Sequence, residues 1–204
     1  MYKFIVTFFL ISILSISAFY YSSISYKKEI LETNKKLTND NLQKEVKIEV
    51  DKENILKYKV KAPDFIWLEN WINSSEIKSI EELKWKVVLI DFWTYSCINC
   101  IRVLPYVQDL HEKYSDKWLV VIWIHTPEFS YEKKLENLKK NVEKRWLTYS
   151  VAQDNDYKTW RNFKNRYWPS LYLIDKDWNI RYKHFWEWNY DKNEQAVKLL
   201  LEEI

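Results

Sequence analysis

The chain of 204 residues contains no glycine, and this absence bears on every tight turn that it can make. Average usage of about 7% would supply roughly 14 glycines in a chain of this length. Tryptophan, in contrast, occurs 12 times, far more often than in an ordinary domain. Glycine is the residue that adopts positive φ without a steric cost, so other residues must occupy the turns that need it.

Composition limits the classes of protein that remain. The length fits one domain, or one domain with appendages. With 47% hydrophobic and 30% charged residues, a packed core is feasible and wholesale disorder is not expected. A net charge of +3 is too small to indicate a nucleic-acid partner. Two cysteines exclude a disulfide-stapled scaffold and cannot complete a four-cysteine zinc site.

The N-terminal segment 4–26 predicts a membrane or export element. It contains 23 residues without a charge after a short basic start. At 1.5 Å per residue, a helix of this length spans about 35 Å, enough for the roughly 30 Å hydrocarbon core. We expect an uncleaved signal anchor; a cleaved signal peptide is the alternative, with small residues at Ser15 and Ser17 before Ala18. Basic residues lie on both sides of the segment, so charge does not fix its orientation.

Two further regions follow the apolar segment. Residues 27–61 are rich in Lys, Glu, Asn and Asp, which predicts a solvated, partly helical tether. Residues 62–204 are expected to form the compact domain. There, strand and helix patterns alternate and end in a hairpin and a helix, which predicts an α/β fold with a central mixed sheet flanked by helices. The expected strands are 86–92, 119–124, 170–174 and 180–185, and the expected helices are 97–114, 131–145, 156–163 and 193–203.

The candidate chemistry lies at Cys97-Ile98-Asn99-Cys100. Half a zinc site, a haem attachment site, two structural thiols and a redox pair all use this spacing. The three histidines lack zinc-ligand spacing, and haem attachment needs a histidine where Ile101 stands. The pair follows a buried strand and opens a helix, where unpaired N–H groups and the helix dipole favour a thiolate at Cys97. Because Cys100 lies one turn further on the same face, the arrangement is typical of a thiol–disulfide exchanger.

The segment Lys86–Pro105, with its Asp-Phe-Trp-Thr-Tyr-Ser-Cys-Ile-Asn-Cys core, resembles the thioredoxin-like superfamily. It is most similar to the extracytoplasmic branch that includes TlpA-like proteins and the thioredoxin-like domain of DipZ. Separate motifs extend the resemblance over about Ala62–Ile204, leaving the first 61 residues outside it. They are His125-Thr126-Pro127-Glu128-Phe129, Asp154-Asn155-Asp156-Tyr157, Asn165-Arg166-Tyr167-Trp168-Pro169 and Tyr172-Leu173-Ile174-Asp175.

The resemblance implies a role for individual residues. Cys97 matches the attacking cysteine and Cys100 the resolving cysteine. Asp91 matches the buried carboxylate that takes a proton during resolution, and Glu128 matches an acid near the active site; a solvated strand end and a surface loop are their alternatives. Pro169 matches a cis-proline that faces the cysteine pair, with a trans turn proline as its alternative.

Two aromatic residues complete the candidate site. Trp93 and Trp168 would line the substrate groove, although both are equally compatible with plain core positions. No cofactor is expected besides the redox-active disulfide Cys97–Cys100.

Together, the apolar segment 4–26 and the resemblance predict a membrane-anchored, extracytoplasmic thiol–disulfide oxidoreductase, which we expect to act as a reductant. Its implied partners are protein thiols and disulfides, a membrane electron donor and, through residues 4–26, the membrane. A peroxidase is the first alternative, because peroxiredoxins carry Pro-x-x-x-Thr-x-x-Cys; Thr94 fits this pattern, but Ile90 replaces the proline. A redox-inert, membrane-tethered docking module is the second.

Against the same family pattern, eight tryptophans stand where glycine is expected. Four agree with turn chemistry alone: Trp178 follows Asp177 at a hairpin tip, where Asp-Gly is favoured, Trp146 ends a helix, and Trp186 and Trp188 are two large aromatics in one turn. The hypothesis is a UGA codon that the source organism reads as glycine and that was translated as tryptophan; the heavy use of Lys, Asn and Ile suits a low-GC genome. The eight positions are Trp67, Trp85, Trp118, Trp123, Trp146, Trp178, Trp186 and Trp188, whereas Trp71, Trp93, Trp160 and Trp168 fit as tryptophan.

Overall fold

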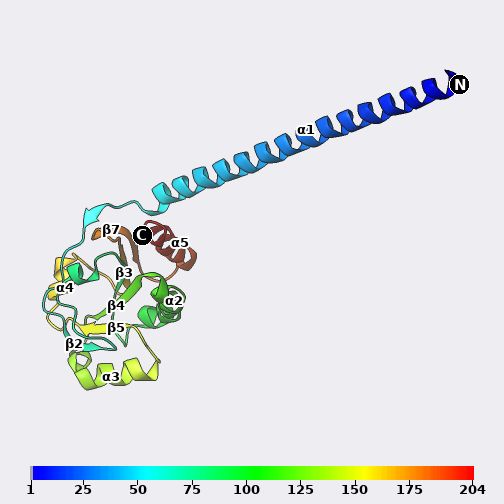
Figure 1. The fold of residues 1–204 in the computed structure, drawn as a ribbon. Helices are drawn as coiled ribbons and strands as arrows, with labels where there is room; N and C mark the ends of the chain where they lie inside the picture. The colour runs from blue at the N-terminus through cyan, green and yellow to red at the C-terminus, as the bar shows by residue number, and fades with distance from the viewer. Residues whose placement is uncertain (1) are drawn as a thin grey trace. The chain divides into compact units, whose positions relative to one another are not determined.

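A computed structural model describes the backbone of residues 2–204 and the side chains of residues 25–47, 49 and 52–204 (Figure 1). The chain divides into two compact units, Met1–Val50 and Asp51–Ile204. A single helix, α1 (Tyr2–Ile55), runs through the first unit and includes residues 27–55 of the predicted tether 27–61. No helix within the described part of the chain is long and apolar enough to cross a membrane. The predicted anchor, 4–26, falls almost entirely on residues whose side chains lie outside that described part.

The second unit is built on one mixed sheet of seven strands in the order β1-β7-β6-β3-β4-β5-β2. The central strands β3, β4 and β5 are parallel, whereas β6 runs antiparallel to β3 and forms the expected hairpin with β7. The strands are β1 (Val60–Lys61), β2 (Glu69–Ile72), β3 (Val87–Trp93), β4 (Leu119–His125), β5 (Ser150–Gln153), β6 (Ser170–Ile174) and β7 (Asn179–Phe185).

Four α-helices and three short 3-10 turns surround the sheet (Figure 1). The helix predicted for 131–145 is divided, because the extended backbone of Lys134 (φ −72°, ψ 118°) separates a 3-10 turn from α3. The helices are α2 (Ile98–Tyr114), α3 (Leu135–Lys144), α4 (Lys158–Asn162) and α5 (Tyr190–Leu201), and the 3-10 turns are η1 (Ile80–Leu83), η2 (Ser115–Lys117) and η3 (Ser130–Lys133).

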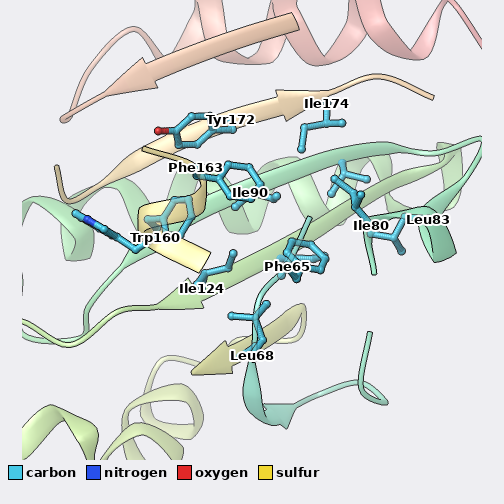
Figure 2. Close-up of a cluster of buried hydrophobic side chains, with 14 of the residues drawn as sticks. Phe65, Leu68, Ile80, Leu83, Ile90, Ile124, Trp160, Phe163, Tyr172 and Ile174 are labelled. Atoms are coloured by element: carbon cyan, nitrogen blue, oxygen red, sulfur yellow. The ribbon is translucent and has the colours of Figure 1, made fainter. Parts of the chain in front are cut away.

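The main core lies on one face of the sheet (Figure 2). Val88, Ile90 and Phe92 of β3 alternate onto this face, as side chains of a strand must. The phenyl ring of Phe92 makes edge-to-face contacts with Trp160 of α4 and with Phe163, each with 5.5 Å between ring centroids. The opposite face therefore receives the other residues of β3, including Asp91, and carries α2 and α5, which contact β4 and β3. The helix that begins beside the cysteine pair thus packs on the face that carries Asp91.

The backbone distinguishes two groups of tryptophan. Seven of the eight positions expected to be glycine have positive φ, from 56° to 82°. None of the four tryptophans expected to be genuine does. A bulky residue with positive φ is an outlier, whereas glycine adopts this conformation freely. The seven are Trp67, Trp85, Trp118, Trp146, Trp178, Trp186 and Trp188.

Trp123 is the exception among the eight. It lies inside β4 in ordinary extended backbone and is fully buried. Its indole ring packs 4.3 Å from that of Trp93 and 4.8 Å from the ring of Tyr149. The backbone at position 123 therefore does not favour glycine, and only the family pattern suggests glycine there.

Candidate active site

The cysteine pair lies at the junction of β3 and α2. After β3 ends at Trp93, the segment Thr94–Ser96 turns the chain, and Cys97 becomes the N-cap residue of α2 with extended backbone (φ −69°, ψ 117°). Its Sγ accepts a hydrogen bond from the backbone N–H of Cys100 at 3.3 Å. The sulfur therefore takes the place that a Ser or Asp oxygen takes at other helix N-termini.

Cys97 is the more acidic thiol of the pair. A hydrogen bond from the Cys100 side chain, aided by the backbone N–H groups of Cys100 and Asn99, lowers the pKa of Cys97 to about 7. Partial burial and the nearby Glu128 carboxylate oppose this shift. Both cysteines are free thiols, and Cys97 is partly exposed. Cys97 is therefore the thiol that ionises more readily, and it is accessible to a reactant.

Cys100 differs in both burial and acidity. Its side chain is only 1% exposed. Burial, followed by the hydrogen bond to Cys97 and the negative charge there, raises the pKa of Cys100 far above its ordinary value. This thiol stays protonated while Cys97 is an anion, so it needs a base before it can act as a nucleophile.

Asp91 is the buried carboxyl whose charge acts on both cysteines. The side chain is 2% exposed in the middle of β3, and its Oδ1 has no hydrogen-bond partner among the described residues. Burial, and then the charge on Cys97, raises the pKa of Asp91 well above its ordinary value, and the same carboxyl contributes to raising the pKa of Cys100. The structure thus brings Asp91 together with both cysteines, as the sequence predicts, and does not place it at a solvated strand end.

Three further residues of the predicted site are Glu128, Trp168 and Pro169. Glu128 is exposed in the loop after β4, and its charge acts on Cys97. The Trp168–Pro169 peptide bond is cis, and the Pro169 carbonyl accepts the N–H of Trp186 at 3.0 Å. Trp168 is half-buried, and its indole N–H donates to the Thr126 carbonyl at 3.0 Å.

The prediction that Trp93 lines the substrate groove is wrong. Its side chain is fully buried and packs against Trp123 and, edge to face, against His125 at 5.5 Å. The physical reason is that β3 continues one residue beyond the predicted end at 92. Residue 93 pairs with His125 of β4 and remains part of the sheet.

Three buried polar residues close to the site are not among the predicted site residues. Thr94, His125 and Glu132 are all fully buried. The Thr94 hydroxyl lies 3.3 Å from His125 Nε2, and the Glu132 carboxylate accepts a hydrogen bond from the Ser96 hydroxyl. Only Glu132 carries a local signal, since it stands three residues after Phe129, the spacing of a residue that caps a helical turn.

Comparison with known proteins agrees with this geometry. A family model described as thioredoxin-like matches residues 84–180. The matched segment is thus similar to thioredoxin-like proteins. It contains β3, the cysteine pair and the cis-proline, so the resemblance read from the motifs is confirmed.

Named relatives place the domain with those of thiol–disulfide oxidoreductases. Protein DipZ of Mycobacterium tuberculosis is 44% identical over 142 residues, which are 69% of this chain and 20% of DipZ. The thiol–disulfide oxidoreductase YkuV of Bacillus subtilis is 27% identical over 62% of this chain and 84% of its own. A crystal structure of a thioredoxin-like superfamily protein superposes with a TM-score of 0.66 at 24% identity, covering 71% of this chain and 98% of its own, which shows the shared fold. The chain thus spans about a fifth of the length of DipZ.

Proposed function

We propose that this protein is an extracytoplasmic thiol–disulfide oxidoreductase that reduces protein disulfides through Cys97 and Cys100. The observation that carries the proposal is the asymmetry of the pair. An accessible Cys97 with a pKa of about 7 is followed by a buried Cys100 whose pKa is strongly raised. Such a pair supplies a nucleophile and a protected second thiol, which is what exchange with a substrate disulfide requires.

The reaction balances with these residues alone. The Cys97 thiolate attacks one sulfur of a substrate disulfide, forming a mixed disulfide and releasing the other sulfur as a thiolate, which takes a proton from solvent. Asp91 then accepts the proton of Cys100, whose sulfur attacks Cys97 and releases the second substrate thiolate. The substrate gains two electrons, and the protein is left with a Cys97–Cys100 disulfide. A separate electron donor must reduce that disulfide before the next cycle.

The proposal includes anchoring in the membrane. The support is the uncharged segment 4–26, after which the described residues of α1 up to Asn54 are mostly exposed and rich in charge. We expect protease added to intact spheroplasts to digest the compact unit, Asp51–Ile204, while a cytoplasmic marker survives. Complete protection of that unit would contradict the extracytoplasmic placement.

An insulin reduction assay tests the activity. With dithiothreitol as donor, the wild-type protein should accelerate the appearance of turbidity, and Cys97→Ser should remove the acceleration. A redox-inert docking module would show no rate above background with either protein. A peroxidase would instead consume hydroperoxide in the presence of a thiol, without a comparable effect on insulin.

The direction of electron flow needs its own measurement. Reduction potentials in this superfamily run from about −270 mV for thioredoxin to about −120 mV for the oxidant DsbA. A reductant should equilibrate with glutathione or dithiothreitol buffers nearer the first value. A potential near the second would reverse the proposed direction while leaving the exchange chemistry intact.

A further inference from the structure

We propose that Glu132 is a positioning residue that joins the loop preceding Cys97 to the loop carrying Glu128 and so holds the Glu128 carboxylate near the reactive sulfur. The inference deepens the proposed function and rests on it for its catalytic meaning, but the contacts that carry it stand independently of any activity.

The contacts of Glu132 reach both loops. Its Oε1 accepts a hydrogen bond from the hydroxyl of Ser96, the residue immediately before Cys97. Its Oε2 accepts the backbone N–H of Glu128 at 2.6 Å and that of Phe129 at 2.9 Å. One carboxylate, 36 residues after Ser96 in the chain, therefore connects the loop before Cys97 to the loop that carries Glu128.

Capping of the η3 turn explains only part of this arrangement. Glu132 is the third residue of η3 (Ser130–Lys133), and a glutamate at that position commonly accepts the N–H of the residue before the turn, here Phe129. Capping glutamates can remain at the surface, whereas Glu132 is fully buried. Capping also requires neither the Ser96 hydroxyl nor the N–H of Glu128. The additional partners are the ones that belong to the reactive site.

The charge of Glu132 survives its burial. Burial pushes the pKa of Glu132 upward, but hydrogen bonds from Ser96, Thr94 and the two backbone N–H groups outweigh it and hold the pKa below its ordinary value. A carboxylate with this number of donors is a fixed anion, because each donor would lose its partner if the group moved away. The Glu132 carboxylate is therefore held rigidly between the two loops.

Other contacts join the same two regions. The Tyr95 hydroxyl donates to the Tyr131 carbonyl at 3.2 Å, and the Arg145 guanidinium donates to the Tyr95 carbonyl at 3.3 Å. These hydrogen bonds join residues near Glu132, but neither of them involves Glu128. Within the described residues, Glu132 is the side chain that binds the backbone of Glu128 itself, so the place of that carboxylate depends on it.

The experiment measures whether Glu128 still influences Cys97 when Glu132 is changed. The pKa of Cys97 is read from the pH dependence of iodoacetamide alkylation of the full-length reduced protein, which needs no catalytic activity. Glu128→Gln removes a negative charge near the thiolate and should lower the pKa of Cys97 by about half a unit. The same change in a Glu132→Ala background should produce no shift, because the loop is already released.

Two variants provide matched controls. The side chain of Glu132→Gln has an amide oxygen that can accept from the two backbone N–H groups and an amide N–H that can donate to the Ser96 oxygen. The effect of Glu128→Gln should therefore persist in it. Glu136→Ala removes an exposed carboxylate four residues further along and should also preserve the effect. Circular dichroism melting identifies any variant that fails to fold. If Glu132→Ala does not fold, Ser96→Ala replaces it, because Ser96 is exposed and its hydroxyl makes the contact to the Cys97 loop.

The outcomes separate cleanly. Loss of the Glu128 effect in Glu132→Ala, or in Ser96→Ala if that variant is used, with retention in Glu132→Gln, supports the positioning role. An equal effect of Glu128→Gln in every background overturns it and leaves Glu132 as a capping residue. Because alkylation reports on the thiol alone, a failure of the insulin assay would refute the proposed function without deciding this result.

Discussion

The Sγ of Cys97 accepts the backbone N–H of Cys100 at 3.3 Å in the first turn of α2. The thiol of Cys100 also donates a hydrogen bond to the same sulfur. The two bonds stabilise negative charge on Cys97 and leave Cys100 in the interior as the protonated partner. The two thiols therefore differ in acidity and in burial, which is the basis of the different roles proposed for them.

Replacing the two cysteines singly should give different results. Cys97→Ser removes the nucleophile, so exchange should be abolished and no covalent adduct should form. Cys100→Ser keeps the first attack but removes the thiol that resolves the mixed disulfide, so adducts with natural partners should accumulate. Non-reducing gels, with and without dithiothreitol, measure the difference. Adducts in the Cys97→Ser protein and none in the Cys100→Ser protein would reverse the two roles.

The acidity of Cys97 predicts a titration near neutral pH. The rate of iodoacetamide alkylation of the reduced protein should rise with a midpoint at about pH 7, since only the thiolate reacts. Mass spectrometry should place the first label on Cys97 and none on the buried Cys100. A midpoint near the pKa of about 8.5 of a free cysteine would show that the helix terminus does not activate this thiol.

Asp91→Asn should slow resolution and leave the attack by Cys97 largely intact, because in the proposed mechanism the buried carboxyl takes the proton of Cys100. The same variant should be more stable than wild type, and increasingly so as pH rises. Below about pH 3.9 the carboxyl is neutral in both folded and unfolded states; above it the unfolded state ionises, while burial keeps the folded pKa raised.

Stopped-flow kinetics and urea unfolding at pH 4 and pH 8 test these two expectations for Asp91→Asn. The proton transfer is visible as a slower second phase with an unchanged first phase. An unchanged resolution rate would assign the proton to Glu128 or to solvent. A stability difference that shrinks as pH rises would contradict the raised pKa.

The sequence predicts the parts of the site that depend on local chemistry. The position of Cys97 at the start of a helix follows from a buried strand, a short turn and a helical pattern in succession. Glu132 escapes prediction because its partners, Ser96 and the N–H of Glu128, come together only when β3 and β4 pair. The short strand β5 (Ser150–Gln153) escapes because its four residues, Ser-Val-Ala-Gln, carry little strand signal and are fixed by pairing with β4.

Burial of His125 should make the protein sensitive to acid. Desolvation lowers the pKa of this histidine to about 4, and its ring stacks on Tyr95. Above pH 6.5 the ring is neutral in both states; as pH falls from 6.5 to about 4, the unfolded state binds a proton that the folded state does not. Wild-type stability should therefore fall by about 3 kcal/mol over this range through His125 alone.

Urea unfolding of wild type and His125→Gln at several pH values between 4 and 7 measures this contribution. The variant loses the ring contacts and should be less stable at pH 7, but its stability should change less on acidification. The test therefore compares how steeply the free energy of unfolding of each protein changes with pH, and not its value at one pH. Parallel slopes for the two proteins would show that the histidine does not resist protonation in the fold.

Glycine should be preferred at the tryptophans with positive φ, both in the natural protein and in stability measurements. Trp146 has φ 56° just after α3, and its side chain is 85% exposed, so its indole gains little from packing. A residue with a Cβ pays about 1–2 kcal/mol for this conformation. Because glycine loses more chain entropy on folding, Trp146→Gly should stabilise by about 1 kcal/mol. Trp160, buried at ordinary φ in the core of Figure 2, is the matched control, and Trp160→Gly should cost at least about 3 kcal/mol.

Peptide mass spectrometry of the natural protein tests the coding hypothesis directly: glycine at position 178 supports it, whereas tryptophan there, at the tip of the β6–β7 hairpin, would refute it.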